Sequence, residues 1–151
     1  MKKFVQNNLF FIAVFLIFVF LALIFFSWSK QRVLDIQSYA LVQDGELEYY
    51  VDQCEIDKSG LLKIKGWAFL KSAPGQGDLL ITHEDAGNNK ILPSYRRMRD
   101  DVLNYFNFPI KPLTFVGFEA SGFLPGKTGV NINILYENRI LRRAENVCEK
   151  Y

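Results

Sequence analysis

The sequence predicts a mainly β protein in which an N-terminal single transmembrane helix is followed by an antiparallel β-sandwich, Ig-like or jelly-roll-like, with one short helix. Three observations support this prediction. An unbroken apolar run lies near the amino terminus. Short segments of alternating apolar and polar residues, separated by turn residues, fill the rest of the chain. Two cysteines lie near the two ends of those segments.

The apolar run extends from Leu9 to Phe26 and reads LFFIAVFLIFVFLALIFF. At about 1.5 Å per residue, a helix over this run measures roughly 27 Å, close to the thickness of a bilayer's hydrocarbon core. We therefore expect residues 1–28 to form a cytoplasmic tail and a transmembrane signal anchor in a bacterial inner membrane, single-pass, with the carboxyl-terminal domain periplasmic or extracellular.

The residues after the run favour an anchor over a cleaved signal peptide. Trp28 fits the membrane–water interface, with Lys30 and Arg32 just beyond it. Ser27 and Ser29 have the spacing of a signal peptidase site, so cleavage is the alternative. The apolar run is longer than the apolar region of a typical signal peptide, which argues against cleavage.

The charge of the chain offers no case for nucleic acid as a partner. The eighteen Lys and Arg exceed the sixteen Asp and Glu by two. Lys2 and Lys3, which precede the apolar run, account for this excess, so the rest of the chain is balanced.

The segment 29–45 is predicted to be a juxtamembrane helix or stalk, because Val33, Ile36 and Ala40 recur at roughly helical spacing. From residue 46 the pattern changes to period two, and residues 46–151 are predicted to form the β-sandwich domain. The seven predicted strands are 46–57, 61–70, 79–83, 90–98, 114–124, 130–136 and 140–147. The helix candidate is 99–106, for which Asp100 or Asp101 is the predicted N-cap.

Cys54 and Cys148 lie near the two ends of the predicted β domain, as a disulfide joining its first and last strands would require. The alternative is two unrelated buried thiols. A metal site is not expected, because the two cysteines and the single histidine, His83, lack metal-ligand spacing, and no cofactor is expected.

Four residues are candidates for acid–base chemistry: His83, Glu84, Asp100 and Asp101. A nucleophilic triad would need an activated Ser or Cys near a histidine, and no Gly-x-Ser-x-Gly pattern occurs. A hairpin tip at His83 and helix capping by the two aspartates are the favoured interpretations, so no catalytic residue is assigned.

Two groups of side chains form the candidate surface for a ligand or partner. In the segment LLKIKGWAFL, alternation places Lys63, Lys65, Trp67 and Phe69 on one face. The second group is basic and comprises Arg139, Arg142 and Arg143. The alternatives are aromatic residues that fill the second side of a sandwich and a solvated strand face.

Three short motifs occur in order: Gly66-Trp67-Ala68, then Arg99-Asp100-Asp101-Val102, then Gly117-Phe118-Glu119. This order resembles a small β-sandwich module found beside or within bacterial cell-surface polysaccharide glycosyltransferases. The resemblance implies a structural role for the residues that match its motifs, with the Arg and the Asp tying the turn to the sheet. Those residues are Gly66, Trp67, Arg99, Asp101, Gly117 and Phe118.

The chain contains no glycosyltransferase catalytic domain, so the resemblance implies an accessory or recognition domain. We expect a membrane-anchored envelope protein that binds an envelope glycan or a membrane protein of polysaccharide assembly. The alternatives are a small envelope enzyme that uses the acidic residues near 84–101, and a purely structural subunit of a membrane complex.

Overall fold

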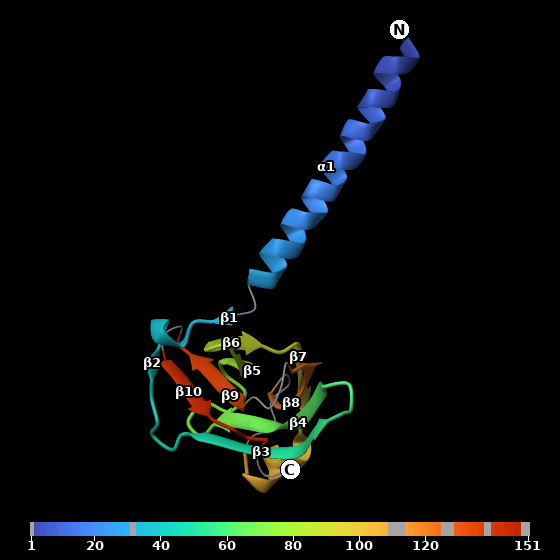
Figure 1. The fold of residues 1–151 in the computed structure, drawn as a ribbon. Helices are drawn as coiled ribbons and strands as arrows, with labels where there is room; N and C mark the ends of the chain where they lie inside the picture. Colours follow the sequence, from blue (N-terminus) through green and yellow to red (C-terminus); the bar gives the residue numbers. More distant parts are fainter. Residues whose placement is uncertain (1, 31–32, 109–113, 125–128, 138–139, 149–151) are drawn as a thin grey trace. The chain divides into compact units, whose positions relative to one another are not determined.

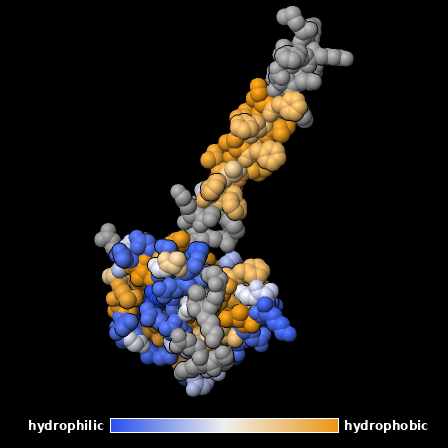
Figure 2. Space-filling view, viewed as in Figure 1, coloured by the Kyte–Doolittle hydropathy of each residue, from blue (hydrophilic) through white to orange (hydrophobic). Residues whose placement is uncertain are grey.

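The computed structural model describes residues 2–30, 33–108, 114–124, 129–137 and 140–148, with the side chains of 11–27 described in the first range. The chain divides into two compact units, Met1–Arg32 and Val33–Tyr151 (Figure 1). The first unit is one helix, α1 (Lys2–Lys30). Its described side chains are apolar except for Ser27 and almost all exposed, as the orange stretch in Figure 2 shows.

The predicted transmembrane helix is corrected by the structure. Among the residues that the structure describes, no helix combines the length and the apolarity needed to cross a membrane. A membrane-spanning helix takes about 20 predominantly apolar residues, and the side chains of α1 are described for residues 11–27.

The second unit is mainly β, as predicted, and its described residues form two sheets. The six-stranded sheet has the order β1-β6-β5-β9-β10-β2, and the four-stranded sheet has the order β3-β4-β8-β7. The strands are β1 (Val33–Leu34), β2 (Ala40–Leu41), β3 (Leu47–Ile56), β4 (Leu61–Leu70), β5 (Asp78–Asp85), β6 (Asn88–Ile91), β7 (Ser94–Met98), β8 (Phe115–Phe123), β9 (Val130–Tyr136) and β10 (Ile140–Ala144).

The main core lies between the two sheets and follows from the alternation of apolar residues. On β4, Leu62, Ile64 and Leu70 are completely buried, as the period of two requires. Ile81 and Ile132 meet them from β5 and β9 of the other sheet. The face of β4 that carries Lys63 and Lys65 points away from this core.

Residues 33–41 differ from the predicted helix or stalk. They form β1, a single 3-10 turn, η1 (Ile36–Ser38), and β2. The segment joins the two edges of the six-stranded sheet, because β1 pairs with β6 at one edge and β2 pairs with β10 at the other. The β2–β10 pair is parallel, so the predicted antiparallel arrangement has one exception.

The predicted strand 90–98 is two strands in two different sheets. β6 ends at Ile91 in the six-stranded sheet, and β7 begins at Ser94 in the four-stranded sheet. Leu92 is buried at the corner, and its backbone N–H donates to the carbonyl of Ile81 at 2.8 Å. Pro93 has no N–H to donate to a ladder, which favours the break at this point.

The predicted disulfide between Cys54 and Cys148 is confirmed. Cys54 belongs to β3 of the four-stranded sheet, and Cys148 follows β10 of the six-stranded sheet. Both cysteines pack against the main core. The bond joins residues 94 positions apart and links the two sheets covalently.

We expect the double variant Cys54→Ser/Cys148→Ser to unfold with a free energy lower by about 2–4 kcal/mol, because the closed loop no longer restricts the unfolded chain. Urea unfolding of the variant and of the oxidised parent measures this difference. The reduced parent should match the variant. An unchanged midpoint in both would contradict a stabilising role for the bond.

Candidate functional site

The outer face of the four-stranded sheet carries a row of aromatic rings. The rings of Tyr50 and Trp67 stack at a centroid distance of 6.3 Å, and those of Trp67 and Phe69 stack at 5.5 Å. Phe69 is only 1% exposed, because helix α2 (Asp100–Tyr105) covers it with Val102 and Leu103. Phe69 is therefore core and not ligand surface, whereas Tyr50 is 55% exposed.

Helix α2 begins differently from the prediction. Its N-cap is Arg99, and no side chain caps it. Asp100 and Asp101 lie in the first turn, where negative charge complements the helix dipole. The carboxylate of Asp101 accepts hydrogen bonds from Arg99 instead of a backbone cap position, with Nε at 2.9 Å and Nη2 at 2.7 Å.

The first and third motifs meet across β4 and β8, where Gly66 pairs with Phe118 and Trp67 pairs with Gly117. A Cβ atom at Gly66 would lie 2.2 Å from the carbonyl oxygen of Tyr50 and 3.0 Å from the ring of Phe118. The absence of a side chain at position 66 therefore lets the Phe118 ring pack in the main core.

Gly117 makes room for a residue of the second motif, Arg99, on the outer face of the sheet. A Cβ atom there would lie 2.6 Å from Cγ of Arg99, so the stem of Arg99 crosses the sheet over this glycine. The Nη1 atom of Arg99 donates to the carboxylate of Asp52 on β3 at 2.6 Å. The hydrogen bonds with Asp101, together with the Asp52 contact, raise the pKa of Arg99, and the hydrogen bonds from Arg99 lower the pKa of Asp101.

Asp52 reaches Arg99 because β3 contains a bulge. The register shifts between Val51, which pairs with Gly66, and Gln53, which pairs with Lys65. Asp52 is the extra residue, and the bulge lets Asp52 and Gln53 both serve the outer face.

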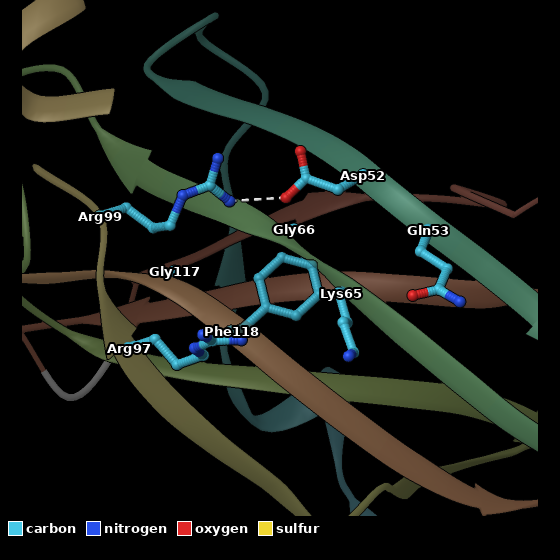
Figure 3. Close-up of a pocket in the computed structure, with 8 residues that line it drawn as sticks. All are labelled: Asp52, Gln53, Lys65, Gly66, Arg97, Arg99, Gly117 and Phe118. Atoms are coloured by element: carbon cyan, nitrogen blue, oxygen red, sulfur yellow. Dashed lines mark hydrogen bonds and ion pairs between the residues drawn. The ribbon is translucent and has the colours of Figure 1, made fainter. Parts of the chain in front are cut away.

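These residues surround a hollow of about 300 Å³ on the outer face, which Figure 3 shows in close-up. Its lining includes the strand residues Gly66 and Gly117. We call it the glycine hollow. Its lining residues are Asp52, Gln53, Lys65, Gly66, Arg97, Arg99, Gly117 and Phe118.

Glu119 organises the charges beside the glycine hollow. Its carboxylate forms ion pairs with Lys65 and Arg97, each at 3.3 Å, and accepts a hydrogen bond from the hydroxyl of Tyr95. The Tyr95 bond, followed by Lys65, lowers the pKa of Glu119, and the same carboxylate raises the pKa of Tyr95. The cations at this site are therefore held by carboxylates.

The predicted basic group lies elsewhere. Arg142 donates from Nε and Nη2 to the carboxylate of Asp44, at 2.8 Å for the shortest bond. This pair lowers the pKa of Asp44 from 3.8 to about 2. Arg143 pairs with Glu145 at 3.3 Å, and Arg139 lies outside the described residues.

The four acid–base candidates belong to two different elements. His83 and Glu84 lie on β5 of the six-stranded sheet, whereas Asp100 and Asp101 begin α2. No hydrogen bond or ion pair joins the two pairs in the described structure. His83 is 5% exposed, and burial lowers its pKa. Among the described residues, no cluster of three or more His, Cys, Asp and Glu could hold a metal ion.

The sequence placed Lys65 on this face and predicted a structural role for Gly66 and Gly117, but it did not single out Asp52, Gln53 or Arg97 as site residues. The alternation of β3 places Asp52 and Gln53 on opposite faces, and only the bulge brings both outward. No signal in the sequence marks the bulge.

No family model, no curated protein and no solved structure matches this chain. The resemblance to the glycosyltransferase-associated module therefore stays a prediction.

We expect Gly66→Ala to destabilise the fold more than Gly117→Ala. At Gly66 the new methyl group meets the backbone of β3, which cannot move independently, whereas at Gly117 it meets a flexible arginine stem. Overpacking costs about 1–3 kcal/mol, and we place Gly117→Ala at the low end and Gly66→Ala at the high end. Thermal unfolding tests the order, with Ser121→Ala on the same sheet as the control. The reverse order would contradict the packing described for the two glycines.

The Asp44–Arg142 pair predicts an acid-sensitive contribution to stability. Because folding lowers the pKa of Asp44, the pair stabilises the fold above pH 3.8, and this contribution is lost as the pH falls towards about 2. We expect Asp44→Asn to lower stability at neutral pH and to flatten this acid limb in urea unfolding. Glu55→Gln, which removes an exposed carboxylate without an ion pair in the described structure, should leave the limb unchanged.

Proposed function

We propose that this protein is a binding or accessory protein of the bacterial cell envelope, and that its ligand is an envelope glycan held at the glycine hollow. The proposal rests on the residues that line the glycine hollow and on the aromatic rings of the same face. A hollow of about 300 Å³ with charged and amide side chains in its lining lies on the same face as the rings of Tyr50 and Trp67, a cross-strand pair that is adjacent to Gly66 in the register.

A sugar ring has hydroxyl groups around its edge and C–H groups on its faces. Its hydroxyls both donate and accept hydrogen bonds, so they need a lining that offers both. The hollow offers the carboxylate of Asp52, the amide of Gln53 and the ammonium group of Lys65. Tyr and Trp supply large apolar faces with a polar edge, which suits the C–H faces of a sugar. The volume is near the lower end for small-ligand sites and matches a small unit.

The disulfide supports a location outside the cytoplasm. Disulfides persist in oxidising compartments such as the periplasm, and they are rare in the reducing cytosol. Cys54 and Cys148 are the only cysteines of the chain, and they are bonded to each other. A glycan of the envelope is present in the same compartment.

The order of the three motifs adds support from the resemblance to modules of polysaccharide glycosyltransferases. The same resemblance also supports a second class of partner, a membrane protein of polysaccharide assembly. Such a protein would dock on the same outer face, and the experiment below distinguishes it from a glycan.

The test is a glycan array probed with the full oxidised chain, run beside affinity capture from envelope extracts. We expect binding to a set of glycans that share a unit. Capture of an envelope protein without any glycan signal would favour the second partner class. The proposal fails if neither a glycan nor an envelope protein binds.

The variant Gln53→Ala assigns any glycan binding to the hollow. The Gln53 amide lines the hollow and makes no other hydrogen bond in the described structure, so its loss should weaken binding without weakening the fold. We expect about a tenfold loss, the equivalent of one hydrogen bond at about 1.4 kcal/mol. Gln37→Ala, at an exposed glutamine of the η1 turn, is the matched control. Equal binding by both variants would place the glycan elsewhere.

A further inference from the structure

We infer that the ligand is a linear, uncharged oligosaccharide that lies along β8 and occupies two neighbouring hollows of the outer face. This inference rests on the proposed function and specifies the length and the charge of the glycan. It is carried by a second hollow, by the register of three strands and by the balance of charge around the glycine hollow.

The second hollow, which we call the serine hollow, also has a volume of about 300 Å³. Its lining includes three hydroxyl residues, Ser94, Tyr95 and Ser121, and two charged residues, Lys63 and Glu119, beside the apolar Pro93 and Ala120. It therefore offers the same mixture of donors and acceptors as the glycine hollow.

The two hollows are adjacent on one face of the sheet. Lys65 of β4, Glu119 of β8 and Tyr95 of β7 are direct partners across the three strands, and they form a row between the hollows. Gly117 lies on one side of this row and Ser121 on the other. Four residues along a strand span about 13 Å, a distance that more than one sugar unit must cover.

The row between the hollows is itself bonded internally. Glu119 holds both Lys65 and the Tyr95 hydroxyl, so the side chains of the row are tied to one another. A sugar chain that crosses the row meets polar groups that are already held in place. Because these groups need no ordering on binding, more of the contact energy of each added sugar unit contributes to affinity.

The charges around the glycine hollow balance. Its cations are Lys65, Arg97 and Arg99. Each is bonded to a carboxylate, from Glu119 for the first two and from Asp52 and Asp101 for the third. An acidic ligand would have to compete with carboxylates already in place, whereas neutral hydroxyls can share these groups. The arrangement therefore favours an uncharged ligand.

An extended peptide fits this face less well. Peptides that add to a sheet pair with the free backbone groups of an edge strand. Here both hollows include residues of β4 and β8, the interior strands of the sheet, whose backbone groups are paired on both sides. Peptide binding is one of the outcomes that the experiment separates.

The test is isothermal titration of the full oxidised chain with monomer, dimer, tetramer and hexamer of cello-, chito- and malto-oligosaccharides. Oligogalacturonates of the same lengths are the acidic counterpart, and a random peptide library is the peptide control. We expect at least one neutral series in which the hexamer binds about tenfold more tightly than the monomer, or better. The acidic series and the peptides should bind more weakly than that hexamer.

Two variants locate the second subsite. Ser121→Tyr fills the serine hollow at an exposed strand position, so it should reduce hexamer binding to the level of the monomer and leave monomer binding unchanged. Asn88→Tyr, at an exposed strand position of the other sheet, is the matched control and should bind the hexamer as the parent does.

Several results would overturn the inference. The inference is overturned by equal affinity for monomer and hexamer, by tighter binding of the acidic series or of peptides, or by an unchanged hexamer affinity in Ser121→Tyr. Each of these results leaves glycan binding at the glycine hollow intact. If no saccharide of the panel binds, the inference is overturned. If the glycan array is also blank, glycan binding itself fails.

Discussion

The guanidinium group of Arg99 joins three parts of the β unit that are far apart in sequence. It holds Asp101 at the start of α2 and Asp52 at the bulge of β3, and its stem crosses β8 above Gly117. A guanidinium suits this task because its planar fork of donors meets a carboxylate with two bonds and still reaches a second one. Without a glycine beneath it, the stem would collide with the sheet.

The position of α2 follows from this contact and decides what the outer face can do. Once Arg99 ties the start of the helix to the sheet, Val102 and Leu103 close over Phe69 and form a second small core. The aromatic row is thereby divided. Its inner end is structural, and its outer end, Tyr50 and Trp67, borders the glycine hollow. The motif glycines thus permit packing on both faces of the sheet, Gly66 towards the main core and Gly117 beneath the stem of Arg99.

Much of the fold could be predicted from local patterns. The predictions that were wrong within the β unit concern segments whose local pattern does not show their place in the sheets. The alternation of β4 indicated its buried face, and the positions of Cys54 and Cys148 indicated the disulfide, which is confirmed. The strand 90–98 was predicted as one because its pattern does not show a change of sheet at Leu92 and Pro93. The segment 33–41 was predicted as helix or stalk because its spacing is nearly helical, yet its pairing partners lie at the two sheet edges. The transmembrane helix was predicted from apolarity alone, and among the described residues no helix combines the length and the apolarity that such a span requires.

For the candidate site, the sequence by itself determined which residue types were available: glycines within strands, an aromatic pair, and charges of both signs in near balance. Period-two alternation was enough to place Lys63, Lys65 and Trp67 on one face, because side-chain direction in a strand is a local property. Only the tertiary structure decided that Asp52 and Gln53 share that face, that Phe69 is covered, and that Arg142 belongs to a separate ion pair with Asp44. These outcomes depend on a bulge, a helix position and a pairing between distant segments. Each is set by contacts between residues that no local pattern connects.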